Sequence, residues 1–209
     1  MKKLTEIANE FKTDKGTMFG ECHSFTEFYN QYFEQYKGKQ INILEIGVLD
    51  GSSLKMYEKY FDNNCKIWGL DIEDKSYLNT ENIHTVRIDQ GSINDLQSFK
   101  DSIGDMKFDI ILDDGSHIPQ HQQLTLYYFS DILTENGIYI LEDLHTFVWD
   151  EMEHTPLYSL VFNKPFYYLT NEENDILKER ISTSTIWSNF NKKSFCCGSS
   201  ITCVLTMNN

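Results

Sequence analysis

The stretch at residues 41–54, INILEIGVLDGSSL, constrains the fold more than any other part of the chain. Residues 41–46 are mostly apolar, a run that is typical of a strand buried on both faces. Gly47 and Gly51 follow, and one of the two serines after them can cap a helix. A strand, a glycine turn and a helix in this order let the backbone approach a ligand closely and direct N–H groups at it. The stretch therefore predicts a nucleotide-type binding turn.

Glu45 indicates which nucleotide this turn suits. A dinucleotide site needs G-x-G-x-x-G, whose middle glycine admits the pyrophosphate, whereas this chain has Glu45-x-Gly47-x-x-x-Gly51. A carboxylate near the turn repels a pyrophosphate and favours a cationic ligand. The pattern resembles the first motif of class I S-adenosylmethionine methyltransferases, whose ligand carries a sulfonium and an ammonium. A buried strand followed by an ordinary glycine turn is the alternative.

The acidic composition argues against two classes of partner. The 209 residues include 18 Lys and Arg against 32 Asp and Glu, for a net charge of −14, whereas nucleic acids and anionic membranes are bound by clustered basic residues. No apolar run approaches the roughly 20 residues of a membrane span, and the N-terminus lacks the apolar region of a secretory signal. The five cysteines form no C-x-x-C pair, so neither zinc nor a disulfide framework is expected. We expect a reduced, cytoplasmic protein.

The N-terminal part of the chain predicts helices that flank a polar loop, TDKGT. A capping box, Ser24-x-x-Glu27, opens the second of these helices. Its aromatic stripe is expected to pack against the sheet, as amphipathic helices usually do. In a sharper interpretation, Asp14, Lys15 and His23 form part of a lid over the cofactor or the acceptor.

Further strands are predicted, and each ends on acids or glycine. Residues 66–71, KIWGLD, end on Asp71, which follows Glu45 by the length of a helix and a turn. A carboxylate at that position can accept hydrogen bonds from both ribose hydroxyls, although it can also be a plain cap residue. After the third strand, TVRI, Asp89 and Gln90 offer acceptors for an adenine amino group.

The rest of the chain completes a doubly wound α/β fold. Strands are predicted at 108–113 and 137–141, with a helix between them that has Pro119 near its first turn. Strands separated by helices fit a parallel sheet, whose ligands lie outside the carboxyl ends of the strands. Strands at 182–190 and 201–207 fit the antiparallel pair with which methyltransferases usually end. We therefore expect a mostly parallel, seven-stranded, Rossmann-like sheet.

A second chemical motif, DDGSH, follows the fourth strand, and an acidic ED pair follows the fifth. Asp114, Glu142 and Asp143 would repel one another unless a cation lies among them, and a set of oxygen ligands suits Mg²⁺. His117 can face the same cavity and take a proton from a hydroxyl that attacks a methyl group. The alternative is a turn-and-cap sequence with a surface histidine. His145 is a further histidine near this motif that can reach the acceptor.

In this order, LEIGVLDGSSL, GLDIEDKS, DQGS, FDIILDDGSH and GIYILEDLHT resemble the metal-dependent sugar O-methyltransferases of macrolide pathways. The upstream TDKGT, with a following His and Tyr, agrees with this resemblance. The likeness covers residues 13–149, and the rest of the chain matches little. It implies that Asp114, Glu142 and Asp143 hold Mg²⁺ and that His117 is the base.

The chain also departs from that family. It lacks the family's large N-terminal extension, so the oligomer and the acceptor pocket do not carry over. His145 stands where a glutamine is expected, which leaves the acceptor contacts open. Ser92 replaces an acid in the loop after the third strand, so the adenine contact can differ.

We therefore expect an S-adenosylmethionine- and Mg²⁺-dependent O-methyltransferase for a sugar hydroxyl on a nucleotide-activated sugar, a surface-polysaccharide precursor or a glycosylated natural product. A catechol-type O-methyltransferase, a nicotinamide-dependent oxidoreductase and a non-catalytic methyltransferase-like subunit are the alternatives, and a homo-oligomer stays open. Residues 1–40 would form a helical lid segment and residues 41–209 the methyltransferase domain, in one compact unit. The residues expected to bind the cofactor are Glu45, Gly47, Gly51, Ser53, Asp71, Ile72, Asp89, Gln90, Gly91 and Asp113.

Overall fold

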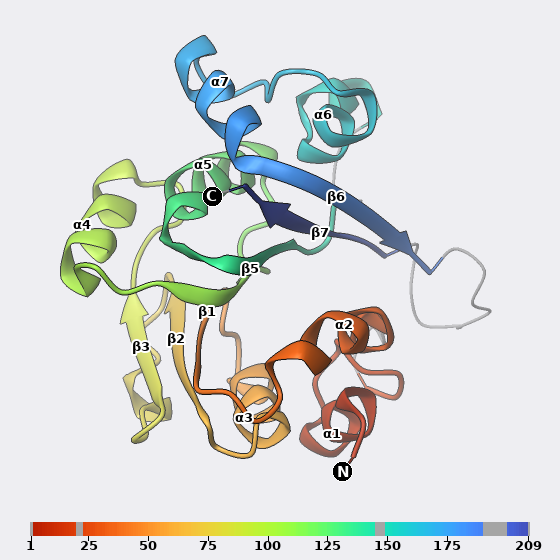
Figure 1. Cartoon of the computed structure of the whole chain (residues 1–209), viewed down its shortest axis with the longest axis vertical. Helices are drawn as coiled ribbons and strands as arrows, with labels where there is room; N and C mark the ends of the chain where they lie inside the picture. The colour runs from red at the N-terminus through yellow and green to blue at the C-terminus, as the bar shows by residue number, and fades with distance from the viewer. Residues whose placement is uncertain (1, 20–22, 145–148, 190–199, 209) are drawn as a thin grey trace.

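Seven strands form one mixed sheet in the computed structural model, which describes residues 2–19, 23–144, 149–189 and 200–208. Their order is β3-β2-β1-β4-β5-β7-β6 (Figure 1). Strands β1 to β5 pair in parallel, and β7 is antiparallel to both β5 and β6. The strands are β1 (Ile41–Ile46), β2 (Cys65–Asp71), β3 (Ile83–Arg87), β4 (Phe108–Asp113), β5 (Leu133–Leu141), β6 (Ile181–Ser188) and β7 (Ile201–Met207). The predicted seven-stranded, Rossmann-like sheet with a terminal antiparallel pair is confirmed.

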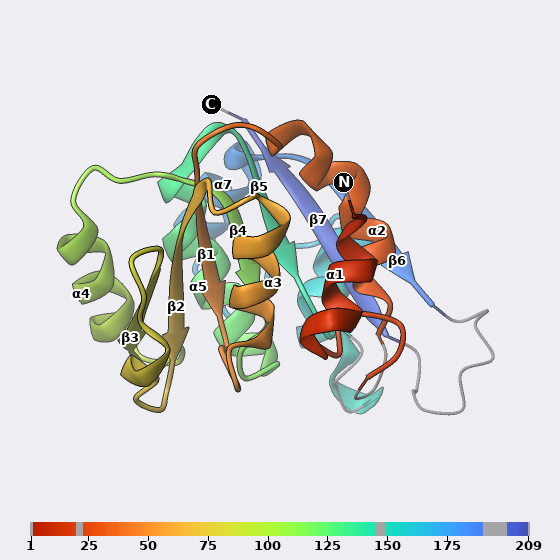
Figure 2. The ribbon, with the colours of Figure 1, turned by 90° about the horizontal axis from the view of Figure 1, so that it is seen from below.

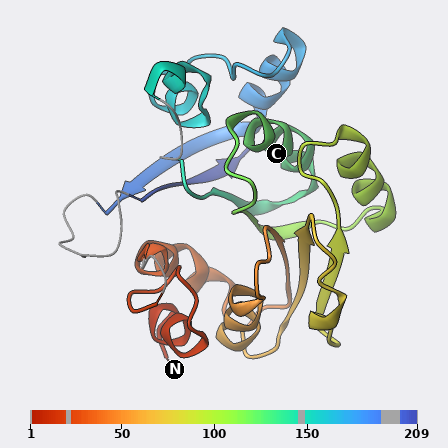
Figure 3. The same cartoon turned by 180° about the vertical axis from the view of Figure 1, so that it is seen from behind.

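Helices cover both faces of this sheet (Figures 2 and 3). One face carries α1 (Leu4–Phe11), α2 (Phe25–Phe33) and α3 (Ser52–Tyr60). The other face carries α4 (Ile93–Ile103), α5 (Pro119–Phe129), α6 (Pro156–Phe162) and α7 (Asn171–Arg180). Short 3₁₀ helices are η1 (Glu34–Tyr36), η2 (Ser76–Leu78), η3 (Ser130–Ile132) and η4 (Trp149–His154).

Two apolar clusters, one on each face, explain why the central strands are apolar along their length. Neighbouring residues of a strand point to opposite faces, so Ile43 packs in the cluster under α1 to α3 and Leu44 packs in the other. The aromatic stripe of α2 lies in the first cluster, where Phe25, Tyr29 and Phe33 are fully buried. The predicted packing of this helix against the sheet is therefore confirmed.

Two of the predicted helix caps are wrong. Ser24 has a left-handed φ of 62° and makes no side-chain cap hydrogen bond, because its N–H is tied to the carbonyl of Gly16 in a tertiary turn (2.9 Å). Helix α3 begins after Gly51, while the hydroxyl of Ser53 donates to Glu45 instead of capping the helix. By contrast, Ser92 accepts the N–H of Asp95 and caps α4.

The chain beyond residue 150 is the part that the sequence described least well. Before β6 it contains the end of η4 and the helices α6 and α7, and none of these helices was predicted above. Helix α7 has a capping box at Thr170, which was a readable local signal. In the described part of the chain, no helix has the length and apolar character needed to cross a membrane.

Gly47→Ala tests how tightly the glycine turn packs. Gly47 has a φ of +87°, and an added Cβ would lie 2.0 Å from the carbonyl oxygen of Asp114. Gly38 has a similar φ of +74°, but its Cβ would meet nothing within 4 Å. Gly38→Ala should therefore lose about 1 kcal/mol of unfolding free energy, from backbone strain alone. Gly47→Ala should lose roughly twice as much or more, because the carbonyl of Asp114 must also move. Urea unfolding measures both losses, and equal losses would contradict the close approach.

Candidate active site

The acidic residues at the carboxyl ends of the parallel strands meet at one edge of the sheet. Glu45 lies near the end of β1, Asp71 ends β2 and Asp113 ends β4. Glu142 and Asp143 follow β5 directly. Because β1 pairs with both β2 and β4, and β4 pairs with β5, the ends of these strands lie at one edge of the sheet, as the strand pattern predicted.

A cavity of about 380 Å³ opens beside the glycine turn at this edge. Asp71 lies at its border, where Oδ2 accepts hydrogen bonds from the N–H groups of Val48 (2.9 Å) and Leu49 (3.3 Å). Asp71 thus holds the turn and also lines the cavity, while its contact with a ribose stays a prediction. The residues that line the cavity are Ile46, Gly47, Leu70, Asp71, Ile72, Ile88, Asp89, Gln90, Gly115, Ser116, Ile118 and His121.

A second cavity of about 190 Å³ continues from Gly47 towards the N-terminal segment. Its walls are residues of the TDKGT loop on one side and the first turn of α3 on the other. Asp114 also lines it. The two cavities share Gly47 in their linings, and the first is the more apolar of the two.

Glu45 is buried and bonds Ser53, which lines the second cavity. Its Oε2 accepts a hydrogen bond from Ser53 Oγ (2.6 Å), whereas Oε1 makes no hydrogen bond and lies 3.8 Å from Lys15 Nζ. Burial raises the pKa of Glu45 to about 7, although Lys15 and Ser53 oppose the shift. A cation that approached Oε1 would stabilise the ionised form.

Lys15 lies at the centre of the acidic cluster and is fully buried. Its ammonium donates to Asp114 Oδ2 and to Glu142 Oε2, the latter at 2.7 Å. Burial alone would lower the pKa of Lys15, but Asp114 and Glu142 hold it well above its ordinary value. The second oxygen of Glu142, Oε1, accepts the hydroxyl of Tyr29 (2.9 Å). Burial raises the pKa of Glu142 strongly, with Lys15 acting against the shift.

Asp114, His117 and Asp143 can hold a metal ion. One ligand atom from each lies within 4.8 Å of the others, and His117 Nε2 is 3.9 Å from Asp114 Oδ1 and 3.5 Å from Asp143 Oδ2. Two carboxylates and an imidazole fit a divalent cation that keeps open positions. Glu142, the third predicted metal ligand, is not in this group, and the ammonium of Lys15 links it to Asp114. His117 and Asp143 both have left-handed backbone, with φ of 58° and 54°.

All three predicted lid residues lie near this site. Lys15 enters the acidic cluster, Asp14 lines the second cavity, and His23 lies beside Asp143. His23 Nδ1 lies 2.5 Å from Ser200 Oγ and 3.8 Å from Asp143 Oδ1. On its other side, His23 Nε2 is 3.9 Å from Asp14 Oδ2. His145 lies outside the described residues.

Asp113 and Gln90 build the wall of the first cavity from inside. Asp113 is fully buried and accepts hydrogen bonds from Gln90 Nε2 (2.7 Å) and Thr125 Oγ1 (2.5 Å). Gln90 in turn accepts the N–H of Ser116 (2.9 Å). Burial raises the pKa of Asp113 to about 6. Gln90 lines the cavity, whereas Asp113 lies behind it.

The other predicted cofactor residues support the turns around the cavity. An added Cβ on Gly51 would lie 2.7 Å from Leu78, and one on Gly91 would lie 2.5 Å from His121. Asp89 accepts the N–H of Gly91 (2.8 Å). The two glycines therefore permit close packing against Leu78 and against His121, of which His121 lines the first cavity.

Some residues of the site were not found from the sequence. Tyr29 was assigned to the packing stripe of α2, yet its hydroxyl bonds Glu142 and lies 2.9 Å from Thr202 Oγ1. Thr125 on α5 was not singled out, although it bonds Asp113. No local signal marks either residue, because each contact joins segments far apart in the chain.

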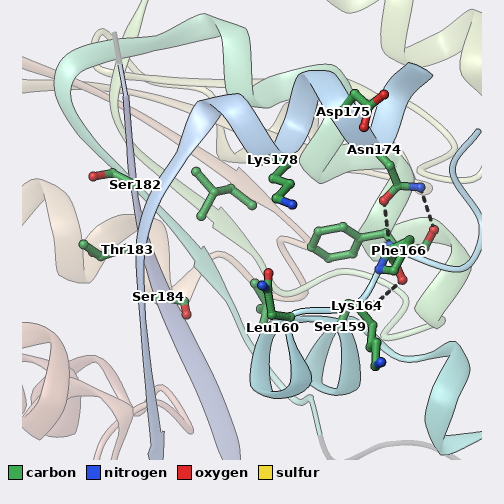
Figure 4. A pocket seen from close by; sticks show the side chains of 13 residues that line it. Ser159, Leu160, Lys164, Phe166, Asn174, Asp175, Lys178, Ser182, Thr183 and Ser184 are labelled. Carbon is green, nitrogen blue, oxygen red and sulfur yellow. Dashed lines mark hydrogen bonds between the residues drawn. The ribbon is translucent and has the colours of Figure 1, made fainter. Parts of the chain in front are cut away.

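A further cavity of about 310 Å³ lies between α6, α7 and the start of β6 (Figure 4). Phe166, Asn174, Lys178 and Thr183 are among the residues that line it. In the described part of the chain, the carboxylates and histidines of the candidate site are absent from its lining. We assign this cavity no part in the chemistry.

Comparison with known proteins confirms the resemblance seen in the motifs, although no family model matches the chain. The chain is 35% identical over 153 residues to demethylmacrocin O-methyltransferase of Streptomyces fradiae and, over the same length, to mycinamicin VI 2''-O-methyltransferase of Micromonospora griseorubida. Each match covers 70% of this chain but only 37% of the relative.

A solved structure gives the same result. The MycE methyltransferase of the mycinamycin biosynthetic pathway, in complex with Mg and SAH, aligns with a TM-score of 0.78 and 26% identity. The alignment covers 100% of this chain and 55% of that chain. The chain therefore has the class I methyltransferase fold and spans about half the length of this neighbour.

The raised pKa of Glu45 predicts a pH dependence of stability. The pKa of this carboxyl is 4.5 in the unfolded chain and about 7 in the folded protein. Its contribution to the free energy of unfolding is therefore present below pH 4.5 and is lost as the pH rises through 7. Over this window the wild type should lose about 3 kcal/mol relative to Glu45→Gln. Urea unfolding from pH 4.5 to 8 measures the difference. Glu135→Gln, at an exposed carboxylate, controls for the lost charge, and parallel curves for wild type and Glu45→Gln would contradict the prediction.

Proposed function

We propose that this protein is an S-adenosylmethionine- and Mg²⁺-dependent O-methyltransferase that methylates a sugar hydroxyl. The observation that carries the proposal is the position of Asp114. This residue belongs to the group that can hold a metal and also lines the cavity next to the glycine turn. An acceptor hydroxyl at the metal group would therefore lie beside a methyl donor bound in the two cavities.

The two cavities suit the two ends of the donor. The adenosine would occupy the 380 Å³ cavity, with Asp71 near the ribose hydroxyls and with Ile72, Gln90 and Ile118 around the base. The methionine end would occupy the 190 Å³ cavity, which Ser53 lines. Ser53 bonds Glu45, whose Oε1 makes no hydrogen bond and would attract the positive charge of the donor. Residues 1–40 would then act as the lid segment, because their loop forms one wall of this cavity.

Asp114 and Asp143 would hold Mg²⁺ with Glu142 beside them. When bound, the ion would lower the pKa of the acceptor hydroxyl and fix its direction. His117 would take the hydroxyl proton at Nε2, the nitrogen that faces the two aspartates. The acceptor oxygen forms its bond to the methyl carbon while the carbon–sulfur bond breaks, and the sulfonium leaves as a neutral thioether. Fixed positions of donor and acceptor supply much of the rate, because the donor is already reactive.

The relatives support a sugar as the acceptor. Two of their names give a glycosylated acceptor: 8-demethyl-8-alpha-L-rhamnosyl tetracenomycin-C 2'-O-methyltransferase of Streptomyces olivaceus and L-olivosyl-oleandolide 3-O-methyltransferase of Streptomyces antibioticus. For this chain the acceptor would be a nucleotide-activated sugar, a surface-polysaccharide precursor or a glycosylated natural product. The cytoplasmic location stays a prediction from the sequence.

A methyl-transfer assay tests this function directly. The protein is incubated with methyl-labelled S-adenosylmethionine, Mg²⁺ and panels of nucleotide sugars, glycosylated macrolides and catechols, and products are read by mass spectrometry. We expect label in a sugar product, a stop on addition of EDTA and recovery when Mg²⁺ is restored. Labelled catechol alone would favour the small-molecule alternative, and activity that resists EDTA would remove the metal from the proposal.

His117→Ala tests the base. Loss of a general base typically costs about 10²–10⁴-fold in turnover, while S-adenosylmethionine should still bind with nearly unchanged affinity by calorimetry. His84→Ala, at a histidine on β3 that packs against Trp68, is the matched control and should keep full turnover. Unchanged turnover in His117→Ala would end the assignment, and loss of Mg²⁺ binding together with turnover would make His117 a metal ligand instead.

A further inference from the structure

We propose that Lys15 is a positioning residue, an internal cation that orients Asp114 and Glu142 and joins the metal side of the site to Glu45 on the donor side. This proposal rests on the proposed function, because that function defines which side of the site holds the metal and which side holds the donor. The contacts that carry it are those of one buried ammonium with three carboxylates from three different strand ends.

The backbone around Lys15 is held in place, so the side chain enters the cluster from a rigid turn. The carbonyl of Lys15 accepts hydrogen bonds from both the N–H and the hydroxyl of Thr26 at 3.0 Å. Gly16 packs so closely that an added Cβ would lie 2.5 Å from Asn9 Oδ1. Asn9 in turn holds Thr17 through two hydrogen bonds of 2.9 Å. This turn connects α1 to α2 and carries Lys15 to the carboxyl ends of β1, β4 and β5.

The ammonium determines which carboxylate oxygens are left for a metal. It takes Asp114 Oδ2 and Glu142 Oε2, while Tyr29 takes Glu142 Oε1. Both oxygens of Glu142 are therefore engaged inside the protein. Asp114 keeps Oδ1 on the side of His117, so Lys15 sets the orientation in which Asp114 faces the metal group.

The same ammonium neutralises a concentration of negative charge. Glu45 and Glu142 are buried, and Asp114 is half-buried beside them. Buried carboxylates that share a site repel one another, and removal of one partner from a buried ion pair is strongly destabilising because it leaves uncompensated charge. Lys15 lies 3.8 Å from Glu45 Oε1, so the compensation extends to the donor side.

Lys15→Met tests the proposal in protein free of metal and donor. The variant keeps the length of the side chain but removes its charge, and we expect its Tm to fall by about 10 °C. Mg²⁺ should raise the Tm of Lys15→Met by more than it raises that of the wild type, because a divalent ion supplies the missing charge. Lys55→Met, at an exposed lysine of α3, is the control and should behave as wild type in both buffers.

The double variant Lys15→Met/Glu142→Gln separates charge compensation from simple packing. Neutralising Glu142 should restore part of the Tm that Lys15→Met loses, and if Lys15→Met does not fold at all, folding of the double variant supports the proposal. A double variant no more stable than Lys15→Met, or a Tm of Lys15→Met equal to that of the wild type, would overturn it. If Mg²⁺ raises the Tm of the wild type, a Tm difference between Lys15→Met and the wild type that is the same with and without Mg²⁺ would also overturn it.

These readouts distinguish the two proposals. If the wild type neither binds Mg²⁺ nor transfers methyl groups, the proposed function fails. The Tm values of Lys15→Met and of the double variant in metal-free buffer still decide whether Lys15 compensates the carboxylates, because neither measurement requires catalysis.

Discussion

Repulsion among buried carboxylates is the constraint on which the rest of this site depends. Parallel strands that end in acidic residues bring like charges to one edge of the sheet, where burial makes each charge costly. The protein relieves this cost with one lysine from the N-terminal segment and with hydroxyl donors such as Tyr29 and Ser53. The helices that carry these donors are therefore electrostatic parts of the site as well as packing elements.

The glycine turn and the loop after β4 are joined by direct backbone contact. The space where a side chain of residue 47 would lie is filled by the carbonyl of Asp114, and the N–H of Asp114 donates to the carbonyl of Ile46 (2.9 Å). Chemistry that depends on alignment between two bound molecules needs the two binding surfaces to keep a fixed separation. This contact keeps the wall of the larger cavity and the first carboxylate of the metal group in register.

The positions of the acids could be predicted from the sequence, whereas their partners could not. Adjacent parallel strands share an edge, so a run of apolar residues followed by Asp71 or Glu142 places each acid without knowledge of the fold. Lys15 lies in a polar loop, a setting that usually means exposure, and only the tertiary approach of the first two helices buries it. Asp113 was expected at the ligand, but as the last residue of β4 it points into the protein and holds Gln90. The cap at Ser24 failed for the same reason, since its backbone follows a tertiary turn.

The left-handed backbone of His117 and Asp143 has a consequence for how the protein can change. A residue with a Cβ is strained in this conformation, and glycine or asparagine would relax it. Replacements that relieve the strain of these two turns would thus stabilise the folded chain but would remove an imidazole or a carboxylate. Substitutions at these two turns therefore trade stability against activity, a trade-off that is common where backbone strain lies at a functional site.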